Sequence, residues 1–472
     1  MNLKSKIIPG LIWNAADKLV SQLGYFLSVL YISKLIGPEA FGLIGMLTIF
    51  ILLTESIVSN GFSQALVQRS NQLTEADSST VFYINILWGG GVYVILFMAS
   101  PVIADFYQKP ELVSIARWLF LSVIVNSLTV VVRAKLIINI DFKSQTIASL
   151  FATLVSSPIA IFLALHGYSY WSFVCLLLIK SVVLNICLWC FSCWYPKALF
   201  SKDSFSRIFK FGSNLMFAGF ISTLVNNIYI ALIGRYFNTA SVGYFTQATN
   251  VTNFLSQFIS STLQGVTYPI LTSVRGERDK LILIYKRLII ATLFVSLPAL
   301  VGLSAVAEDF VLLFLGKQWL FAVPIIQLLC IARMITPISA INMSVLNAVG
   351  RSDLFLKVDL SKLPMTIVSL FISIPYGING IASGMVIVSF ISFFINAYYP
   401  GKLFGFGAVE QLKVGIKVII ATVTMYVSLS FVHYDILWVA FLMKILIGIG
   451  VYLLVLFSLQ EKEVLFFIKK YI

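Results

Sequence analysis

Long apolar stretches, separated by short polar segments, recur along the whole chain. Windows of about 20 apolar residues, the length that an α-helix needs to cross the hydrocarbon core of a bilayer, can be placed about fourteen times. The sequence therefore predicts an all-α polytopic membrane protein. The predicted spans are approximately 8–33, 39–61, 81–104, 112–132, 145–165, 168–192, 206–234, 240–263, 284–305, 321–347, 354–374, 377–397, 414–432 and 437–458.

The basic residues are unevenly distributed between the predicted loops. Of the 33 Lys and Arg residues, 24 lie at loops on the side of the N-terminus and 4 at the opposite loops. Cytoplasmic loops carry an excess of Lys and Arg, and an even number of spans returns the chain to its starting side. Both termini are therefore predicted to be cytoplasmic, in a multi-pass protein of an inner membrane. Orientation and attraction to anionic membrane lipids account for the net charge of +14, so no nucleic-acid partner is expected.

Composition excludes a soluble enzyme and offers no catalytic constellation. The chain is 59% apolar and 11% charged, against about 45–50% and about 25% in soluble domains. Cys187, Cys190 and Cys193 are evenly spaced, but no His or carboxylate lies near them, which favours packed thiols over a metal site. Both histidines, His166 and His433, fall in short loops. We expect no metal, no cofactor and no enzymatic activity.

An internal repeat relates the two halves of the chain. The segment Lys34–Gly42 matches Arg235–Gly243 at an offset of 201 residues, and each copy joins two helices spotted with polar residues. Because six spans precede the second copy, the repeats share their orientation, as in transporters built from parallel repeats. We predict a six-helix lobe over residues 1–200, a second over 201–400, and two further helices with a cytoplasmic tail over 401–472.

Polar side chains follow one face of the helices in both repeats. Such residues are costly in lipid, so they normally face the bundle interior or a water-filled cavity. Hydrogen bonds between helices explain single polar residues, but stripes on corresponding helices favour a hydrophilic passage between the lobes. The amide, hydroxyl and ring groups suit a sugar. The candidate cavity residues on these stripes are Asn14, Asp17, Lys18, Gln22, Tyr25, Glu55, Asn226, Asn227, Asn250, Asn253 and Gln257.

Several cations also fall within predicted spans. Lys180 lies midway along the sixth span and Arg333 within the tenth, and we expect both to line the cavity. Arg117 and Lys444 can instead snorkel toward the membrane surface. A cavity with more cations than acids would suit an anionic headgroup such as a pyrophosphate.

Short stretches spread over most of the chain resemble the polysaccharide transporters of the multidrug/oligosaccharidyl-lipid/polysaccharide superfamily, in particular the O-antigen flippases and colanic acid exporters. Their order and spacing carry the resemblance more than any one of them. The matching stretches are Gly37–Leu43, Gly61–Arg69, Asp141–Lys143, Phe211–Gly212, Gly234–Phe237, Val242–Ala248, Tyr268–Leu271, Leu297–Pro298, Phe314–Trp319 and Gly350–Asp353.

This resemblance implies a flippase that moves an undecaprenyl-diphosphate-linked oligosaccharide across the bacterial inner membrane by alternating access. It implies two six-helix lobes and two extra helices, a proton or sodium ion for coupling, and polysaccharide polymerase machinery among the partners. A multidrug antiporter of the same superfamily is one alternative, and its cationic substrates would favour an acidic pocket. A polysaccharide polymerase or ligase is another, but it would need a sizeable catalytic loop outside, and no outer loop exceeds roughly 15 residues.

Overall fold

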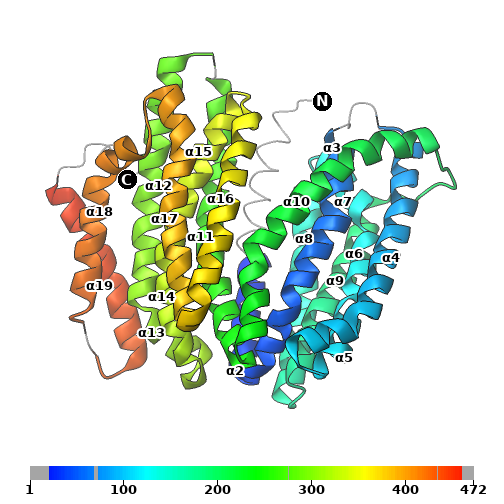
Figure 1. Cartoon of the computed structure of the whole chain (residues 1–472), viewed down its shortest axis with the longest axis horizontal. Coiled ribbons are helices and arrows are strands. Elements are labelled where there is room, and N and C mark those ends of the chain that lie inside the picture. Colours follow the sequence, from blue (N-terminus) through cyan, green and yellow to red (C-terminus); the bar gives the residue numbers. More distant parts are fainter. Residues whose placement is uncertain (1–20, 69–72, 275, 433, 460–472) are drawn as a thin grey trace. The chain divides into compact units, whose positions relative to one another are not determined.

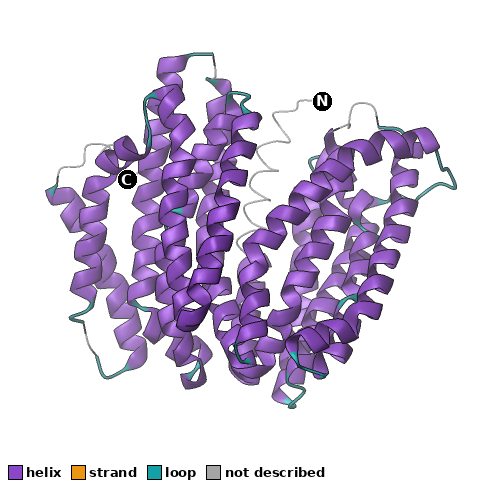
Figure 2. Ribbon diagram, viewed as in Figure 1, coloured by secondary structure: helices purple, strands orange, loops and turns teal. Residues whose placement is uncertain are grey.

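The chain folds into helices joined by short turns. A computed structural model describes residues 21–68, 73–274, 276–432 and 434–459, and no strand occurs within them (Figure 2). The helices form two compact units, Met1–Gly243 and Tyr244–Ile472.

The first unit begins with a helix that is broken near its middle. Within α2 (Gln22–Glu55), Gly37 has φ 79° and is followed by Pro38. Only glycine adopts this conformation readily, and proline ends the hydrogen-bond ladder, so α2 contains two successive helical stretches. A π-helical turn, Ser56–Asn60, follows. The other helices are α3 (Gly61–Gln68), α4 (Glu75–Tyr107), α5 (Glu111–Leu119), α6 (Leu121–Ser127), α7 (Val130–Ile138), α8 (Phe142–Leu165), α9 (Tyr170–Ser192) and α10 (Lys202–Tyr236) (Figure 1).

The matching turns of the predicted repeat pack against each other reciprocally. A Cβ atom on Gly42 would overlap with the carbonyl oxygen of Thr239, and one on Gly243 would overlap with the carbonyl oxygen of Pro38. Each contact is the other shifted by the offset of 201 residues. Both glycines are therefore required for the close approach of the two turns.

Small residues also bring α10 against the helices that precede it in the chain. A Cβ atom on Gly61 would lie 2.5 Å from the carbonyl oxygen of Gly212, and one on Gly219 would lie 2.8 Å from Oγ of Ser56. Lipid tails are as apolar as the side chains, so close van der Waals packing of this kind is what associates such helices. This packing places α10 in the first compact unit, which ends at Gly243. The repeat predicts a different division, with the second lobe beginning at residue 201, and that division stays a prediction.

The second unit continues from α11 (Thr239–Ser273), a helix that starts just before the boundary between the units. The last two helices belong to this unit, because α18 packs on α12 and α19 packs on α18. The helices that follow α11 are α12 (Arg278–Ala305), α13 (Ala307–Phe310), α14 (Val323–Arg333), α15 (Thr336–Ala348), α16 (Ser352–Ser373), α17 (Gly377–Phe404), α18 (Ala408–Leu429) and α19 (Leu437–Ser458), with a π-helical turn at Val311–Leu315 and 3₁₀ turns at Lys317–Ala322 and Ile374–Tyr376.

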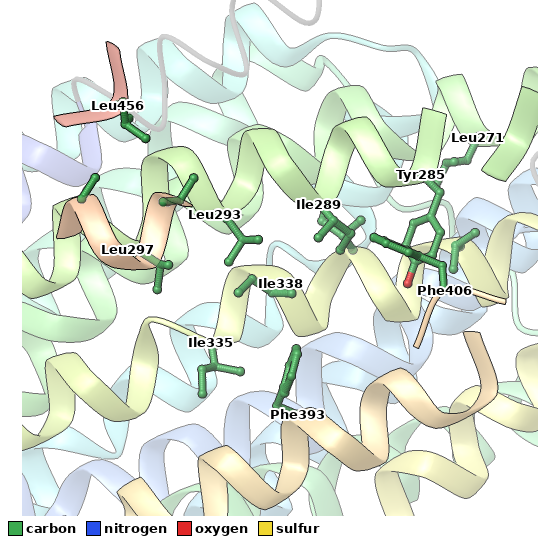
Figure 3. Close-up of a cluster of buried hydrophobic side chains, with 14 of the residues drawn as sticks. Leu271, Tyr285, Ile289, Leu293, Leu297, Ile335, Ile338, Phe393, Phe406 and Leu456 are labelled. Carbon is green, nitrogen blue, oxygen red and sulfur yellow. The ribbon is translucent and has the colours of Figure 1, made fainter. Parts of the chain in front are cut away.

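A buried apolar cluster holds the second unit together. Figure 3 shows Ile335 and Ile338 among the side chains of this cluster, together with Leu293, Leu297 and Phe393. The cluster draws on α11, α12, α15, α17, α18 and α19, so the two C-terminal helices share the core of this unit.

A polar triad joins three helices beside this cluster. The Tyr285 hydroxyl donates to Oδ1 of Asn342 at 2.6 Å, and Nε2 of Gln411 donates to the Tyr285 oxygen at 2.9 Å. The Asn342 amide in turn donates to Oε1 of Gln411 at 3.2 Å. All three residues are buried, and the mutual hydrogen bonds attach α18 to α12 and α15.

The prediction of an all-α polytopic membrane protein is confirmed. Among the described residues, nine helical segments are long and apolar enough to cross a membrane, or ten if the bent segment Glu111–Ile138 counts as one span. Two segments, of 47 and 52 residues, each cover two predicted spans. The predicted count of about fourteen is consistent with these helices. The two predicted spans outside this set are α10 and α11, the helices whose polar stripes lower their hydropathy.

Candidate functional site

The first unit brings two of the predicted cavity residues together. Nζ of Lys180, on α9, lies 3.4 Å from the centre of the Tyr25 ring on α2. Both side chains are half-buried. An ammonium over a ring face is attracted by about 0.5–2 kcal/mol, most strongly where water is excluded. One turn further along α2, Ser28 donates to Oγ of Ser157 at 2.8 Å, which links α2 to α8. The polar face of α2 therefore contributes an aromatic ring that holds a cation of α9.

The remaining candidates of the first repeat are more exposed. Gln22 lies one turn before Tyr25, and Glu55 is the last residue of α2 before the π-helical turn; both side chains are exposed. Asn14, Asp17 and Lys18 lie outside the described residues.

The two asparagines of α10 are bonded within their own helix. Nδ2 of Asn227 donates to the carbonyl oxygen of Thr223 at 2.8 Å, and Nδ2 of Asn226 donates to Oγ of Ser222 at 3.3 Å. These local bonds satisfy one donor of each amide, while the exposed Asn226 keeps polar atoms at the surface of α10.

The stripe on α11 divides into an accessible face and a buried face. Asn250 and Asn253 are half-buried and Gln257 is exposed. Sequence reasoning missed Gln247, which is fully buried and whose two amide atoms lack hydrogen-bond partners among the described residues. Polarity alone does not tell which of two adjoining faces of α11 is buried. Other buried hydroxyls of α11 without a partner in the described chain are those of Thr239, Thr246, Thr249, Ser260 and Thr267.

Arg333 occupies a break between two helices of the second unit. It is the last residue of α14, and α15 begins at Thr336. Nε of Arg333 is buried and has no hydrogen-bond partner in the part of the chain that the structure describes. That Arg333 lines a cavity stays a prediction; the structure places its Nε, buried and without a partner among the described residues, beside interrupted helical backbone.

Other cations of the spans have partners. Nζ of Lys444, on α19, lies 2.6 Å from Oδ2 of Asp309 on α13, in a pair whose side chains are 17% and 12% exposed. Sequence reasoning interpreted Lys444 as a snorkelling residue and missed this partner. Arg117 donates from Nε to Oγ of Ser100 at 3.1 Å and lies 4.3 Å from the centre of the Phe97 ring.

Arg351, between α15 and α16 and outside the spans, is an arginine whose donors have hydrogen-bond acceptors. Nε and Nη2 of Arg351 donate to the two carboxylate oxygens of Asp353 at 2.9 and 3.0 Å. These hydrogen bonds and the carboxylate charge raise the pKa of the Arg351 guanidinium above its ordinary value. On Arg333, by contrast, the buried Nε has no hydrogen-bond partner among the described residues.

Among the described residues, no three His, Cys, Asp or Glu side chains lie close enough together to hold a metal ion. The five cysteines are free thiols. The arrangement therefore offers polar side chains and cations for binding.

Comparison with known proteins adds sequence relatives and a shared fold. A family described as "Polysaccharide biosynthesis protein" matches residues 31–324. The teichuronic acid biosynthesis protein TuaB of Bacillus subtilis is 28% identical over 72% of this chain and 71% of its own length. The lipopolysaccharide biosynthesis protein WzxC of Escherichia coli is 24% identical over 84% of this chain and 81% of its own length. Among solved structures, the lipid II flippase MurJ in an inward closed conformation aligns with a TM-score of 0.75 and 18% identity, over 95% of this chain and 98% of MurJ.

Proposed function

Because the chain belongs to the polysaccharide biosynthesis protein family, we propose that it is a flippase for an undecaprenyl-diphosphate-linked oligosaccharide, such as an O-antigen or exopolysaccharide repeat unit. The observation that carries this proposal is the combination of family membership with a fold shared with a lipid II flippase over 95% of the chain. The protein moves its substrate by alternating access and performs no chemistry on it.

Polar and cationic side chains give this proposal a physical basis. A glycan must exchange hydrogen bonds with water for hydrogen bonds with protein, which the amides and hydroxyls of α2, α10 and α11 supply. A diphosphate needs cations, and Lys180 and Arg333 are the cations that we expected to line the cavity. In this proposal, the candidate residues of the predicted cavity bind the substrate. A proton or sodium gradient drives the transport cycle. Polysaccharide polymerase machinery consumes the product.

The chain is a multi-pass bacterial membrane protein. We propose that it lies in the inner membrane with both termini in the cytoplasm. In a variant without the native cysteines, a cysteine placed at Asn238 should react with a membrane-impermeant thiol reagent added to intact spheroplasts. One placed at Glu277 should react only after permeabilisation. The reverse pattern would refute the orientation.

Depletion of the protein tests the function directly. Lipid-linked oligosaccharide should accumulate on the cytoplasmic leaflet while its synthesis continues. An impermeant glycan-directed reagent should then label it in inside-out vesicles and not in right-side-out vesicles. Single repeat units displayed outside without polymer would favour a polymerase, and unchanged lipid-linked pools with greater sensitivity to cationic drugs would favour an antiporter.

Two lysine variants test in the same assay whether the cation beside Tyr25 contributes to flipping. Lys180→Gln removes the cation beside Tyr25, whereas Lys280→Gln removes an exposed cation that pairs with Glu277 at 3.5 Å. We expect the first to reduce flipping by about tenfold, the size of one hydrogen bond to a charged group, and the second to leave it unchanged. Equal activity in both variants would remove Lys180 from the binding role.

A further inference from the structure

The linker between α9 and α10, residues 193–201, is bound to the N-terminal turns of α4. The backbone N–H of Lys197 donates to Oγ of Ser79 at 3.0 Å. The backbone N–H of Ser201 donates to Oγ1 of Thr80, also at 3.0 Å. Both hydroxyl-bearing side chains are fully buried. The backbone of a surface loop can bond to water, but here two hydroxyls of α4 take that role, and they fix the path of the linker.

Trp194 anchors the start of the linker. Its Nε1 donates to Oε2 of Glu75 at 2.9 Å, and the side chain is buried. The indole ring stacks on Trp189 at 6.0 Å and meets Phe82 edge-on at 5.9 Å. Nζ of Lys135 lies 4.6 Å from the ring centre and pairs with Glu75 at 2.8 Å. These contacts hold one face of the linker against α4, α7 and α9.

The other side chains of the linker are exposed, and several of them are large and apolar. Tyr195 is 74% exposed and Phe200 is 59% exposed. Protein surfaces in water seldom gather such side chains without a partner, and this segment lies outside the predicted spans 168–192 and 206–234. The exposed residues that we call the outer face of the linker are Tyr195, Lys197, Leu199, Phe200 and Lys202, the last of which begins α10.

The acids beside the linker already have cationic partners. Glu75 pairs with Lys135 at 2.8 Å, and Oδ1 of Asp77 lies 3.6 Å from Nη2 of Arg207. Residues 193–203 contain two lysines and one acid, Asp203. The outer face of the linker is therefore positively charged as well as apolar.

We propose that the outer face of the linker binds the headgroups of anionic phospholipids at the membrane surface. Aromatic side chains such as tyrosine prefer the headgroup level of a bilayer, and lysines are attracted to the negative surface of the cytoplasmic leaflet. The outer face presents both kinds of side chain on a backbone that α4 already fixes, so binding requires little further ordering. The leaflet follows from the proposed orientation, whereas the binding does not depend on flippase activity.

The purified full-length protein in detergent tests this surface without a transport assay. It is titrated with phosphatidylglycerol, and separately with phosphatidylcholine as the neutral lipid, while hydrogen–deuterium exchange of residues 193–202 is followed. Phosphatidylglycerol should slow exchange in this segment, and phosphatidylcholine should do so much less. The double change Lys197→Gln with Lys202→Gln should raise the concentration of phosphatidylglycerol required by about thirtyfold, the effect of two lysines near an anionic surface.

A second pair of exposed lysines provides a control of equal charge. Lys280 and Lys413 lie far from the linker in the sequence, and both are exposed. The double change Lys280→Gln with Lys413→Gln should leave the response of the linker to phosphatidylglycerol unchanged. An equal loss in the two double variants would mean that only net charge matters, and would overturn the proposal.

The aromatic part of the outer face is tested by a further variant. Tyr195→Ser with Phe200→Ser keeps both lysines and should lose most of the protection by phosphatidylglycerol. Absence of protection in the wild type, or equal protection by the two lipids, would contradict the proposal. Protection that rises with protein concentration and not with lipid would assign the outer face to a second copy of the chain, and would equally overturn it. Failure of the proposed function would show separately, as unchanged leaflet distribution on depletion while protection by phosphatidylglycerol persisted.

Discussion

Lys180 in the first unit and Arg333 in the second both lie within membrane spans, but their surroundings differ. Lys180 is on continuous helix α9 and stacks on the ring of Tyr25 at 3.4 Å. Arg333 ends α14 at a proline-induced break, and its Nε has no acceptor among the described residues. The Tyr25 ring stabilises the lysine ammonium, whereas no described residue accepts a hydrogen bond from the Nε of the arginine.

Lys444, a third cation within a membrane span, can be added to this comparison because it forms an ion pair with Asp309. Its distance of 2.6 Å and low exposure indicate a structural contact between α19 and α13. The three cations thus range from an ion pair, through a ring contact, to an unpaired edge. The Nε of Arg333 is therefore the least satisfied of these three cationic groups, and the ammonium of Lys444 is the most satisfied.

The largest stability effect is expected from breaking the ion pair. Lys444→Met leaves the carboxylate of Asp309 without its cation in a poorly solvated place. We expect a loss of about 2–4 kcal/mol, below the full cost of a buried pair because both side chains keep some exposure. Thermal unfolding of the detergent-solubilised protein, followed by fluorescence-detected size exclusion, measures it. The double change Asp309→Asn with Lys444→Met should recover most of the loss.

An exposed pair supplies the control for this experiment. Lys280→Met breaks the contact with Glu277, whose side chain is 65% exposed, and should cost less than about 1 kcal/mol. If Lys444→Met unfolds at the wild-type temperature, the ion pair does not hold α19 on the second unit.

Hydropathy predicted the helical spans well because crossing a membrane imposes a length and an apolar composition on each helix. The stripe on α2 likewise led to Tyr25, and the rarity of cations in lipid led to Lys180 and Arg333. The partner of Lys444 was missed because Asp309 lies 135 residues earlier, and such a contact depends on how α13 and α19 pack. The sequence analysis did not predict the break after Arg333, although Pro337 lies four residues later. The hydroxyls of Ser256 and Ser389 beside it come from helices distant in the sequence.

The smallest effect on stability is expected from changes to Tyr25, whose ring lies against Lys180. This effect tests whether the ring stabilises Lys180. Tyr25→Phe keeps the ring face and should leave stability unchanged, whereas Tyr25→Leu removes it and should cost about 0.5–2 kcal/mol. In a Lys180→Gln background the leucine change should cost less, because no ammonium remains to be stabilised by the ring. Thermal unfolding of the four proteins gives this coupling. Equal losses from Tyr25→Leu in both backgrounds would mean that the ring contributes only packing, and that Lys180, like Arg333, depends on another group for its stabilisation.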